Sequence, residues 1–503
     1  MNFPQLLETD FPLLSYTIFS PLFGVFLLLL VNGENHALHK IIGIFSSLIT
    51  FILSLFILRS FTDSSDFQLA EKYSWIANLG INFTLGIDGL SIWLVVLTTF
   101  LSFLVIVSSD SVHEKLRAYI ICMLLLEVGM LGTFLALDAI AFYVFWEIML
   151  IPMYFLIGIW GGQRRLYAAI KFVLYTAFGS LLMLVAIAYL GMKYQAQFGM
   201  YSFYFGDWMK LTLTHSEQIW LFLAFALAFS IKIPLFPFHT WLPDAHVEAP
   251  TGGSVILAGV LLKMGLYGII RICVPIFPHA VVETAPVFAI LGVVGIIFGA
   301  LVAWKQTDMK KLVAYSSVSH LGFCVLGYAA LNLQGMQGSL LQMLNHGVST
   351  AALFFLVGVL YDQKHTRMIA DYGGIGAKLP FFAVMFLIFT LSSIGMPLTN
   401  GFIGEFLIMI GGFGVYKYLA SAATLGVIFG AIYMLSLYRR VVFGEFNVEK
   451  NGDLVDLSFR EKFVFTPLLI LVFVIGLYPQ IFLSKMEKSA AYSLKYLEKI
   501  ERK

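Results

Sequence analysis

Long apolar stretches dominate this chain and limit what it can fold into. A helix needs about 20 mostly apolar residues to cross the roughly 30 Å hydrocarbon core of a bilayer. The 503-residue sequence contains fourteen stretches that approach this length, at residues 13–30, 41–58, 90–107, 119–136, 140–159, 172–190, 219–233, 255–274, 285–304, 313–330, 340–360, 381–413, 419–438 and 463–482. We therefore predict an all-α, polytopic membrane protein with about 14 transmembrane helices.

The composition argues against a soluble or nucleic-acid-binding protein. Hydrophobic residues make up 60% of the chain and charged residues 12%, whereas roughly 25% of the residues in soluble proteins are charged. The lipid bilayer is therefore the expected surrounding. The formal net charge is +2 without a long basic run, so we expect no nucleic-acid partner. Cys122, Cys273 and Cys324 share no CxxC spacing and are expected to be packing residues.

The loops differ in charge, and this difference predicts the orientation of the chain. If the stretches cross the membrane in turn, the loops on one side contain most of the Lys and Arg residues, including Arg164, Arg165 and Lys310. The loops on the other side contain few, including Arg271. The positive-inside rule makes the first side cytoplasmic. We therefore predict a bacterial inner membrane protein with both termini in the periplasm. A basic tail after Phe482 is the exception, but late charges orient a polytopic chain weakly.

A short internal repeat suggests how the chain is organised. The strings Ser230–Leu235 (SIKIPL) and Ser393–Leu398 (SIGMPL) share four of six residues, and each lies in the third span of a block of five. Because five is odd, the two blocks have opposite orientations. Proline removes a helical hydrogen bond, so Pro234 and Pro397 predict a broken helix in each block, which is typical of inverted-repeat transporters. The alternative is that both prolines only kink core helices.

These observations predict four segments. Residues 1–116 form an N-terminal three-helix segment, and residues 117–274 form the first five-helix repeat, helices four to eight. Residues 285–440 form the second, inverted five-helix repeat, helices nine to thirteen. Residues 441–503 contain a loop, the last helix and a short tail.

Charged residues lie within the apolar stretches, among them Glu127, Glu147, Lys232, Lys263 and Glu405. Each charge at the bilayer centre costs roughly 2.5–3.5 kcal/mol, so these groups must face one another, the bundle interior or water. Burial favours the neutral form of an acid or a lysine, whereas a nearby opposite charge favours its charged form. If the oppositely charged partner moves away, the proton affinity of the group it leaves therefore changes. The pattern therefore predicts a proton relay. Structural ion pairs that fix helix register are the alternative, and for Glu127 the two interpretations are evenly balanced.

Position along the chain suggests individual roles in this relay. Glu147 has no local cation, and Lys232 stands two residues before Pro234, so we expect these two residues to pair across helices. His320 and His346 also lie within apolar stretches. Because histidine titrates near neutral pH, both are expected to carry protons between the charged groups. A satisfied buried histidine is the alternative for each.

The polar segment from His239 to Glu248 invites comparison with a metal site. Pro243 interrupts it and the HExxH spacing is absent, so we predict no metal and a polar loop that places His246 and Glu248 at a proton entrance. The chain has no haem motif, iron–sulfur cysteine set, Walker sequence or dinucleotide fingerprint. We therefore expect no cofactor in this chain.

The same residues resemble a known family. Phe145–Glu147, the break at Lys232–Pro234, and above all the segment FHTWLPDAHVEAPTGGSVILAGVLLKMG from Phe238 to Gly265 are similar to the antiporter-like subunits of respiratory complex I. The resemblance covers nearly the whole chain. Glu405 stands where the related L and N subunits and the Mrp antiporter chains usually carry lysine, so the resemblance is greatest to the M branch of the family.

The resemblance implies a proton-translocating membrane-arm subunit of NADH-quinone oxidoreductase. It implies Glu147 paired with Lys232, Lys263 as the central relay, Glu405 as the terminal group, and His320 and His346 along a hydrated axis. It also implies other complex I subunits as partners, with the L and N subunits on either side, while FMN, iron–sulfur clusters and quinone belong to other subunits. An Mrp-type cation/proton antiporter subunit is the alternative function.

Overall fold

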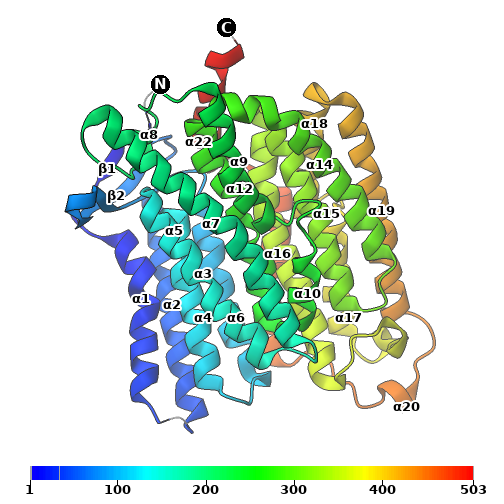
Figure 1. The fold of residues 1–503 in the computed structure, drawn as a ribbon. Coiled ribbons are helices and arrows are strands. Elements are labelled where there is room, and N and C mark those ends of the chain that lie inside the picture. Colours follow the sequence, from blue (N-terminus) through cyan, green and yellow to red (C-terminus); the bar gives the residue numbers. More distant parts are fainter. Residues whose placement is uncertain (1–2, 33, 502–503) are drawn as a thin grey trace.

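Long, nearly parallel helices form the body of the molecule (Figure 1). The computed structural model describes residues 3–32 and 34–501, so the ends of the two predicted terminal segments lie outside the described residues. The first half contains α1 (Leu13–Leu30), α2 (His36–Ser60), α3 (Ile92–Val107), α4 (Leu116–Leu135), α5 (Ala139–Ile148), α6 (Leu150–Trp160), α7 (Arg165–Phe198), α8 (Phe205–Trp208), α9 (His215–Lys232), α10 (Trp241–Glu248), α11 (Thr251–Ile256), α12 (Lys263–Gly268) and α13 (Val274–Ile276). The second half contains α14 (Pro278–Trp304), α15 (Met309–Ala329), α16 (Leu333–Lys364), α17 (Pro380–Ser393), α18 (Asn400–Val415), α19 (Lys417–Val442), α20 (Val448–Asn451), α21 (Phe459–Leu477) and α22 (Gln480–Glu501).

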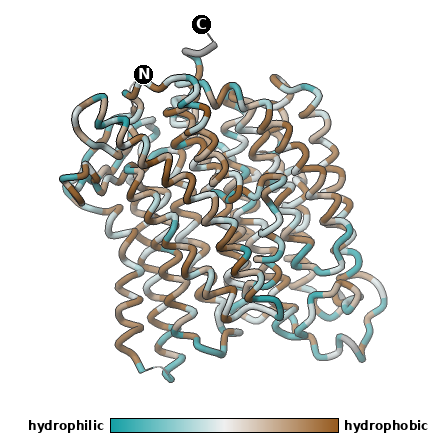
Figure 2. Tube along the Cα trace, in the orientation of Figure 1, coloured by the Kyte–Doolittle hydropathy of each residue, from teal (hydrophilic) through white to brown (hydrophobic). Residues whose placement is uncertain are grey.

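The helical membrane fold predicted from the sequence is confirmed. Among the described residues, ten helices are long and apolar enough to cross a membrane, or eleven if the bent pair α21–α22 counts as one. Three more apolar helices, α3, α17 and α18, are shorter. Hydrophobic residues line the helices and hydrophilic residues gather at their ends and in the loops (Figure 2). The count of about 14 crossings stays a prediction.

Two helices are interrupted where the repeated strings lie. α9 ends at Lys232 and the chain turns before α10 begins at Trp241. α17 ends at Ser393 and α18 begins at Asn400. The fifth predicted stretch is also interrupted. α5 ends directly before Met149 and α6 begins directly after it, and this break was not predicted from the sequence.

The helical segment Thr251–Ile276 lies at the centre of the molecule, and its most apolar 18-residue window is completely buried. Two π-helical turns, Leu257–Leu261 and Ile269–Cys273, separate its three α-helical pieces. Lys263 begins the middle piece, directly after the first π-helical turn and Leu262. Extra turns of this kind occur often at functional sites because they free backbone carbonyls and re-aim side chains.

A small sheet near the N-terminus was not predicted. Strands β1 (Leu6–Glu8), β2 (Phe67–Ile76) and β3 (Ile81–Ile87) lie in the order β1-β2-β3, with β1 parallel and β3 antiparallel to β2. Tyr73 pairs with Phe83 across the hairpin. Aromatic and β-branched residues favour strands, but the all-α prediction assigned residues 1–116 to three helices only.

Glycines let two helices of the second half approach closely. A Cβ atom added at Gly322 of α15 would lie 2.6 Å from the carbonyl oxygen of Gly292 on α14. A Cβ atom at Gly299 of α14 would lie 2.8 Å from the backbone nitrogen of Ser319. Small residues bring membrane helices together in this way. The contact fixes α15, which carries His320 of the candidate site.

The predicted short tail continues as helix α22, which bends by 68° from α21. It docks on the loop before α3 and on the first turn of α3. The Gly89 backbone nitrogen in the loop donates to Ser489 Oγ at 2.9 Å, and Trp93 Nε1 in α3 donates to the Phe482 carbonyl at 3.2 Å. The N- and C-terminal ends of the described chain lie at the same end of the molecule (Figure 1).

Candidate functional site

Glu405 is the centre of a polar cluster at the second helix break. It lies in the second turn of α18, where its Oε1 atom is 3.1 Å from His320 Nδ1 of α15 and accepts a hydrogen bond of 3.1 Å from Gln342 Nε2 of α16. Glu405 and His320 are both buried. His320 Nε2 lies 3.2 Å from the hydroxyl of Ser393, the last residue of α17. Three neighbouring helices and the break therefore meet at one carboxylate.

A glycine in the break makes room for this carboxylate. Gly395 has φ +71°, a conformation that glycine adopts without strain. A Cβ atom at this position would lie 2.9 Å from Glu405 Oε2. The unwound segment therefore passes against Glu405, where its backbone groups and water can solvate a changing charge.

An amide and hydroxyl network supports the break from α16. Asn345 Nδ2 donates to Gln342 Oε1 at 3.1 Å and to the Asn400 carbonyl at 2.8 Å. Ser392 Oγ donates to Asn400 Oδ1 at 2.6 Å. The sequence analysis missed these residues. The signal was available, because Gln342, Asn345 and His346 follow the i, i+3, i+4 spacing that places side chains on one helix face.

Lys263 joins this cluster through two histidines. Lys263 Nζ, completely buried, lies 2.8 Å from His346 Nδ1 and donates a hydrogen bond to the Ala258 carbonyl in the π-helical turn. The rings of His346 and His320 have their centres 5.9 Å apart. The sequence-predicted residues Lys263, His346, His320 and Glu405 therefore follow one another from the central helical segment to the second break.

A small cavity lies between the two histidines. It has a volume of about 10 Å³ and is lined by His320, His346, Asn345, Ser349 and neighbouring polar residues. This volume is about the smallest that holds one water molecule. His346 Nε2 has no hydrogen-bonding partner among the described residues, and a water in this cavity would supply one.

Glu147 and Lys232, predicted as a pair, do not hydrogen-bond to each other. Lys232 is buried, and its Nζ lies 5.1 Å from the centre of the Trp146 ring and 5.8 Å from that of Phe172. Lys232 Nζ and Glu147 Oε1 both lack a hydrogen-bonding partner within the described part of the chain. Glu147 is nevertheless close enough for its charge to act on Lys232. The aromatic faces hold the ammonium in place of a carboxylate.

The remaining predicted residues differ in their surroundings. Glu127 on α4 is completely buried, and neither of its carboxylate oxygens has a partner among the described residues. His246 on α10 is also completely buried and stacks on Phe354 with ring centres 4.7 Å apart. Lys263 is close enough to act electrostatically on His246. His246 is thus close to Lys263, whereas Glu127 forms no hydrogen bond with the cluster around Glu405 among the described residues.

The described residues contain no group of three or more His, Cys, Asp or Glu side chains that could hold a metal ion. Cys122, Cys273 and Cys324 are free and buried, as expected of packing residues. The site is therefore built from titratable and hydrogen-bonding side chains. Such groups can bind and pass protons.

Buried acids, lysines and histidines beside two interrupted helices define a class of ion-translocating membrane protein. The family model described as NADH:quinone oxidoreductase/Mrp antiporter, TM, matches residues 136–430. The chain belongs to this family, and the resemblance predicted from its sequence is confirmed.

Individual relatives sharpen this assignment. The chain is 45% identical to NADH-quinone oxidoreductase subunit M of Rhodobacter capsulatus, over 95% of this chain and 96% of that protein. It is 43% identical to NADH-ubiquinone oxidoreductase chain 4 of Marchantia polymorpha, over 97% and 98% of the two chains.

Two solved structures have a similar fold. A chain of respiratory complex I from Thermus thermophilus with bound NADH is 30% identical, with a TM-score of 0.88 over 96% of this chain and 99% of that chain. A chain of the Mrp complex from Dietzia sp. DQ12-45-1b is 19% identical, with a TM-score of 0.81 over 97% of this chain and 100% of that chain. The second likeness concerns the fold alone.

Proposed function

We propose that this chain is a proton-translocating membrane-arm subunit of NADH-quinone oxidoreductase. The observation that carries the proposal is the sequence of contacts Lys263–His346–His320–Glu405, because each neighbour can accept a proton from the one before it. The relatives named as NADH-quinone oxidoreductase subunit M support the choice of complex. NADH oxidation and quinone reduction then take place in other subunits, which carry FMN and the iron–sulfur clusters.

In this proposal the two halves of the site have different tasks. Glu147 and Lys232 interact by charge without a hydrogen bond, so a change at Glu147 alters the proton affinity of Lys232. Lys263 passes the proton by way of His346 and His320 to Glu405, beside the unwound segment. Pro234 and Pro397 keep both segments unwound. The chain has other complex I subunits as partners, with the L and N subunits on either side, and lies in the bacterial plasma membrane with periplasmic termini.

Purification from the native membrane tests the assignment to the complex. The chain is affinity-purified in mild detergent, its companions are identified by mass spectrometry, and NADH-dependent quinone reduction is measured. Flavin and iron–sulfur subunits with this activity are the expected result. Companions restricted to small antiporter chains, without NADH oxidation, would instead assign the chain to an Mrp-type antiporter.

A substitution tests the relay itself. We expect Glu147→Gln to assemble normally and to lower NADH-driven proton uptake into liposomes, because an amide cannot carry the charge that acts on Lys232. Glu283→Gln is the matched control, because Glu283 is exposed and pairs with His215 outside the relay. Normal proton uptake by the Glu147→Gln complex would contradict the proposed relay.

A further inference from the structure

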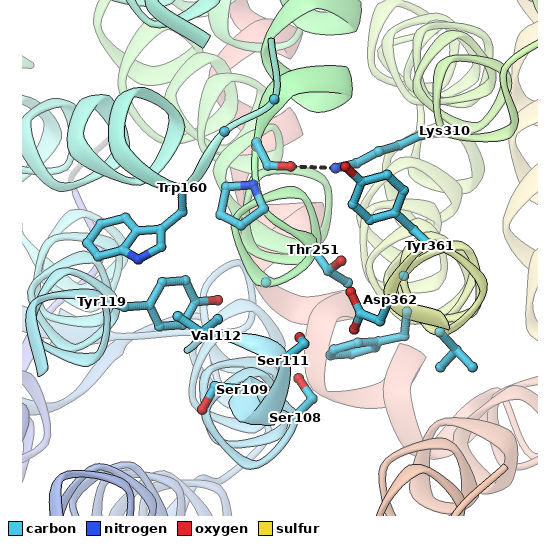
Figure 3. Close-up of a pocket in the computed structure, with 18 of the residues that line it drawn as sticks. Ser108, Ser109, Ser111, Val112, Tyr119, Trp160, Thr251, Lys310, Tyr361 and Asp362 are labelled. Carbon is cyan, nitrogen blue, oxygen red and sulfur yellow. Dashed lines mark hydrogen bonds between the residues drawn. The ribbon is translucent and has the colours of Figure 1, made fainter. Parts of the chain in front are cut away.

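A cavity of about 470 Å³ opens between the loops that precede α4, α7 and α11 and the ends of α16 and α21. Its walls carry Ser108, Ser111, Asp362 and other polar residues, together with Tyr119 and Trp160 (Figure 3). The cavity has room for on the order of ten water molecules. We call it the vestibule. It lies on the side whose basic loops are predicted to be cytoplasmic.

Lys310 lies at the inner wall of the vestibule. The sequence analysis counted it among loop charges, but the structure buries it in the first turn of α15. Its Nζ donates a hydrogen bond to the carbonyl of Ala249 (Figure 3). The charged groups that act on it are Arg367, Asp308, Glu248 and Asp362. Lys310 is thus a buried titratable group that lines the vestibule and has no place in the relay described above.

His246 is within electrostatic range of both Lys310 and the relay residue Lys263. Its two ring nitrogens are buried and lack hydrogen-bonding partners among the described residues. Buried polar groups are nearly always hydrogen-bonded, to protein or to ordered water. Ordered water is the partner that fits this place, and it would connect His246 to the lysine on each side.

We propose that Lys310 is the residue at which a proton leaves the vestibule for the relay, by way of His246 and Lys263. This inference rests on the proposed function. A hydronium ion in the vestibule protonates the neutral Lys310 amine and becomes water. The ammonium then donates a proton to one ring nitrogen of His246, whose other ring nitrogen donates its proton to the neutral amine of Lys263. Lys310 is neutral again, and His246 has changed its tautomer.

Three substitutions at Lys310 separate this role from a structural one. Lys310→Arg keeps a cation and a donor for the Ala249 carbonyl, but guanidinium does not release its proton in proteins. Lys310→Gln removes the charge, and Lys310→His restores a group that titrates. Lys311→Arg is the matched control, because Lys311 follows Lys310 on the same helix and does not line the vestibule.

Proton uptake per NADH oxidised is measured for each complex in liposomes, after its assembly has been checked on native gels. If the whole flux through this subunit passes Lys310, Lys310→Arg and Lys310→Gln lower that flux by about 100-fold or more, the size of effect typical of losing an acid–base group. Lys310→His keeps most of it. Uptake by Lys310→Arg equal to that of the Lys311→Arg control would overturn the proposal, because a structural donor would then suffice.

A thiol probe keeps the test decisive if the Lys310 variants fail to assemble. Ser111 is exposed in the vestibule wall, and the native cysteines are buried. A membrane-impermeant thiol reagent added on the cytoplasmic side is expected to label Ser111→Cys and to block proton uptake. Thr307→Cys, exposed in the loop before α15 on the same side and outside the vestibule lining, is the control that is labelled but leaves uptake unchanged. Labelled Ser111→Cys with normal uptake would contradict the vestibule as the entrance.

Failure of this inference and failure of the proposed function give different results. If Glu147→Gln abolishes proton uptake while the Lys310 and Ser111 variants pump normally, protons reach Lys263 by another route and only the entrance is wrong. If Glu147→Gln also pumps normally, the relay itself is wrong.

Discussion

Replacing Asp88 with alanine is expected to destabilise strongly the end of the protein that carries the small sheet. Arg271 in the eighth predicted span donates from Nη1 to Asp88 Oδ2 at 2.9 Å and from Nη2 to Asp88 Oδ1. Both side chains are buried. In Asp88→Ala the guanidinium keeps the Tyr267 hydroxyl at 3.1 Å and the ring of Phe67 at 4.9 Å, but it has no counter-ion.

The size of the effect follows from this burial. Leaving one partner of a buried ion pair uncompensated costs roughly 3–5 kcal/mol. At 1.36 kcal/mol per factor of ten, this corresponds to roughly a 150- to 5,000-fold change in a folding equilibrium. Replacing both partners with apolar residues, as in Asp88→Leu with Arg271→Met, is expected to recover most of the loss, because hydrophobic pairs of similar volume often replace buried ion pairs without cost.

A buried cysteine reports the unfolding of this region. Cys273 lies two residues after Arg271 and is completely buried, so it reacts with a thiol reagent only when the region opens. Labelling of the Cys273 peptide is quantified by mass spectrometry in the whole complex along a denaturant series. Asp63→Ala is the control. Asp63 and its ion-pair partner Lys485 are more exposed than Asp88 and Arg271, and exposed ion pairs contribute about 0–1 kcal/mol to stability. Equal labelling of Asp88→Ala and the control would refute the reasoning.

Three further substitutions test packing, pH dependence and the second break. Gly322→Ala is expected to lower the free energy of unfolding by about 1–3 kcal/mol, because it overpacks the α14–α15 contact. Gly295→Ala is the control and is expected to be tolerated, because its added Cβ meets its nearest neighbour at 3.9 Å. The temperature at which the purified complex aggregates distinguishes the two variants. Burial raises the pKa of Asp138, in the loop before α5, from 3.8 to about 6 although backbone N–H groups oppose the shift. The folded chain therefore holds more protons than the unfolded chain between about pH 4 and pH 6, so stability falls as pH rises through this window, and a pH series of melting temperatures should lose this slope in Asp138→Asn. Asn345→Leu removes the hydrogen bond to the Asn400 carbonyl and is expected to destabilise the second break by about 1–3 kcal/mol. Limited proteolysis should then cleave the chain faster at this break than in the unaltered protein.

Periodicity and composition suffice to predict the helical membrane fold, because each span must satisfy its backbone within itself and cover its length with apolar side chains. The β2–β3 hairpin escaped prediction for a physical reason. Strand signals are short and context-dependent, and Phe67 and Ile87 are buried by contact with helices distant in sequence. Hydropathy along the chain contains no information on such contacts.

The ionic residues show the same limit. Their presence in apolar stretches is visible in the sequence, and their partners are not. Lys310 and Arg271 look like loop charges by position, yet both are buried, because helices remote in the chain pack over them. The Lys263–His346 contact joins residues 83 positions apart. Only the folded structure places such residues side by side, whereas Gln342 and Asn345 could have been found from their spacing to His346.

The two halves of the candidate site differ in how they hold a cation, and this difference determines where a proton can move. Lys263 touches His346 at 2.8 Å, so a proton can pass between them along a hydrogen bond. Lys232 is held over the Trp146 and Phe172 rings, and an aromatic face stabilises a cation but accepts no proton. On the proposed function, Lys232 therefore exchanges a proton only when water or Glu147 reaches its amine. In the proposed function, the first half therefore influences the relay by its charge, while the second half supplies the groups that pass the proton.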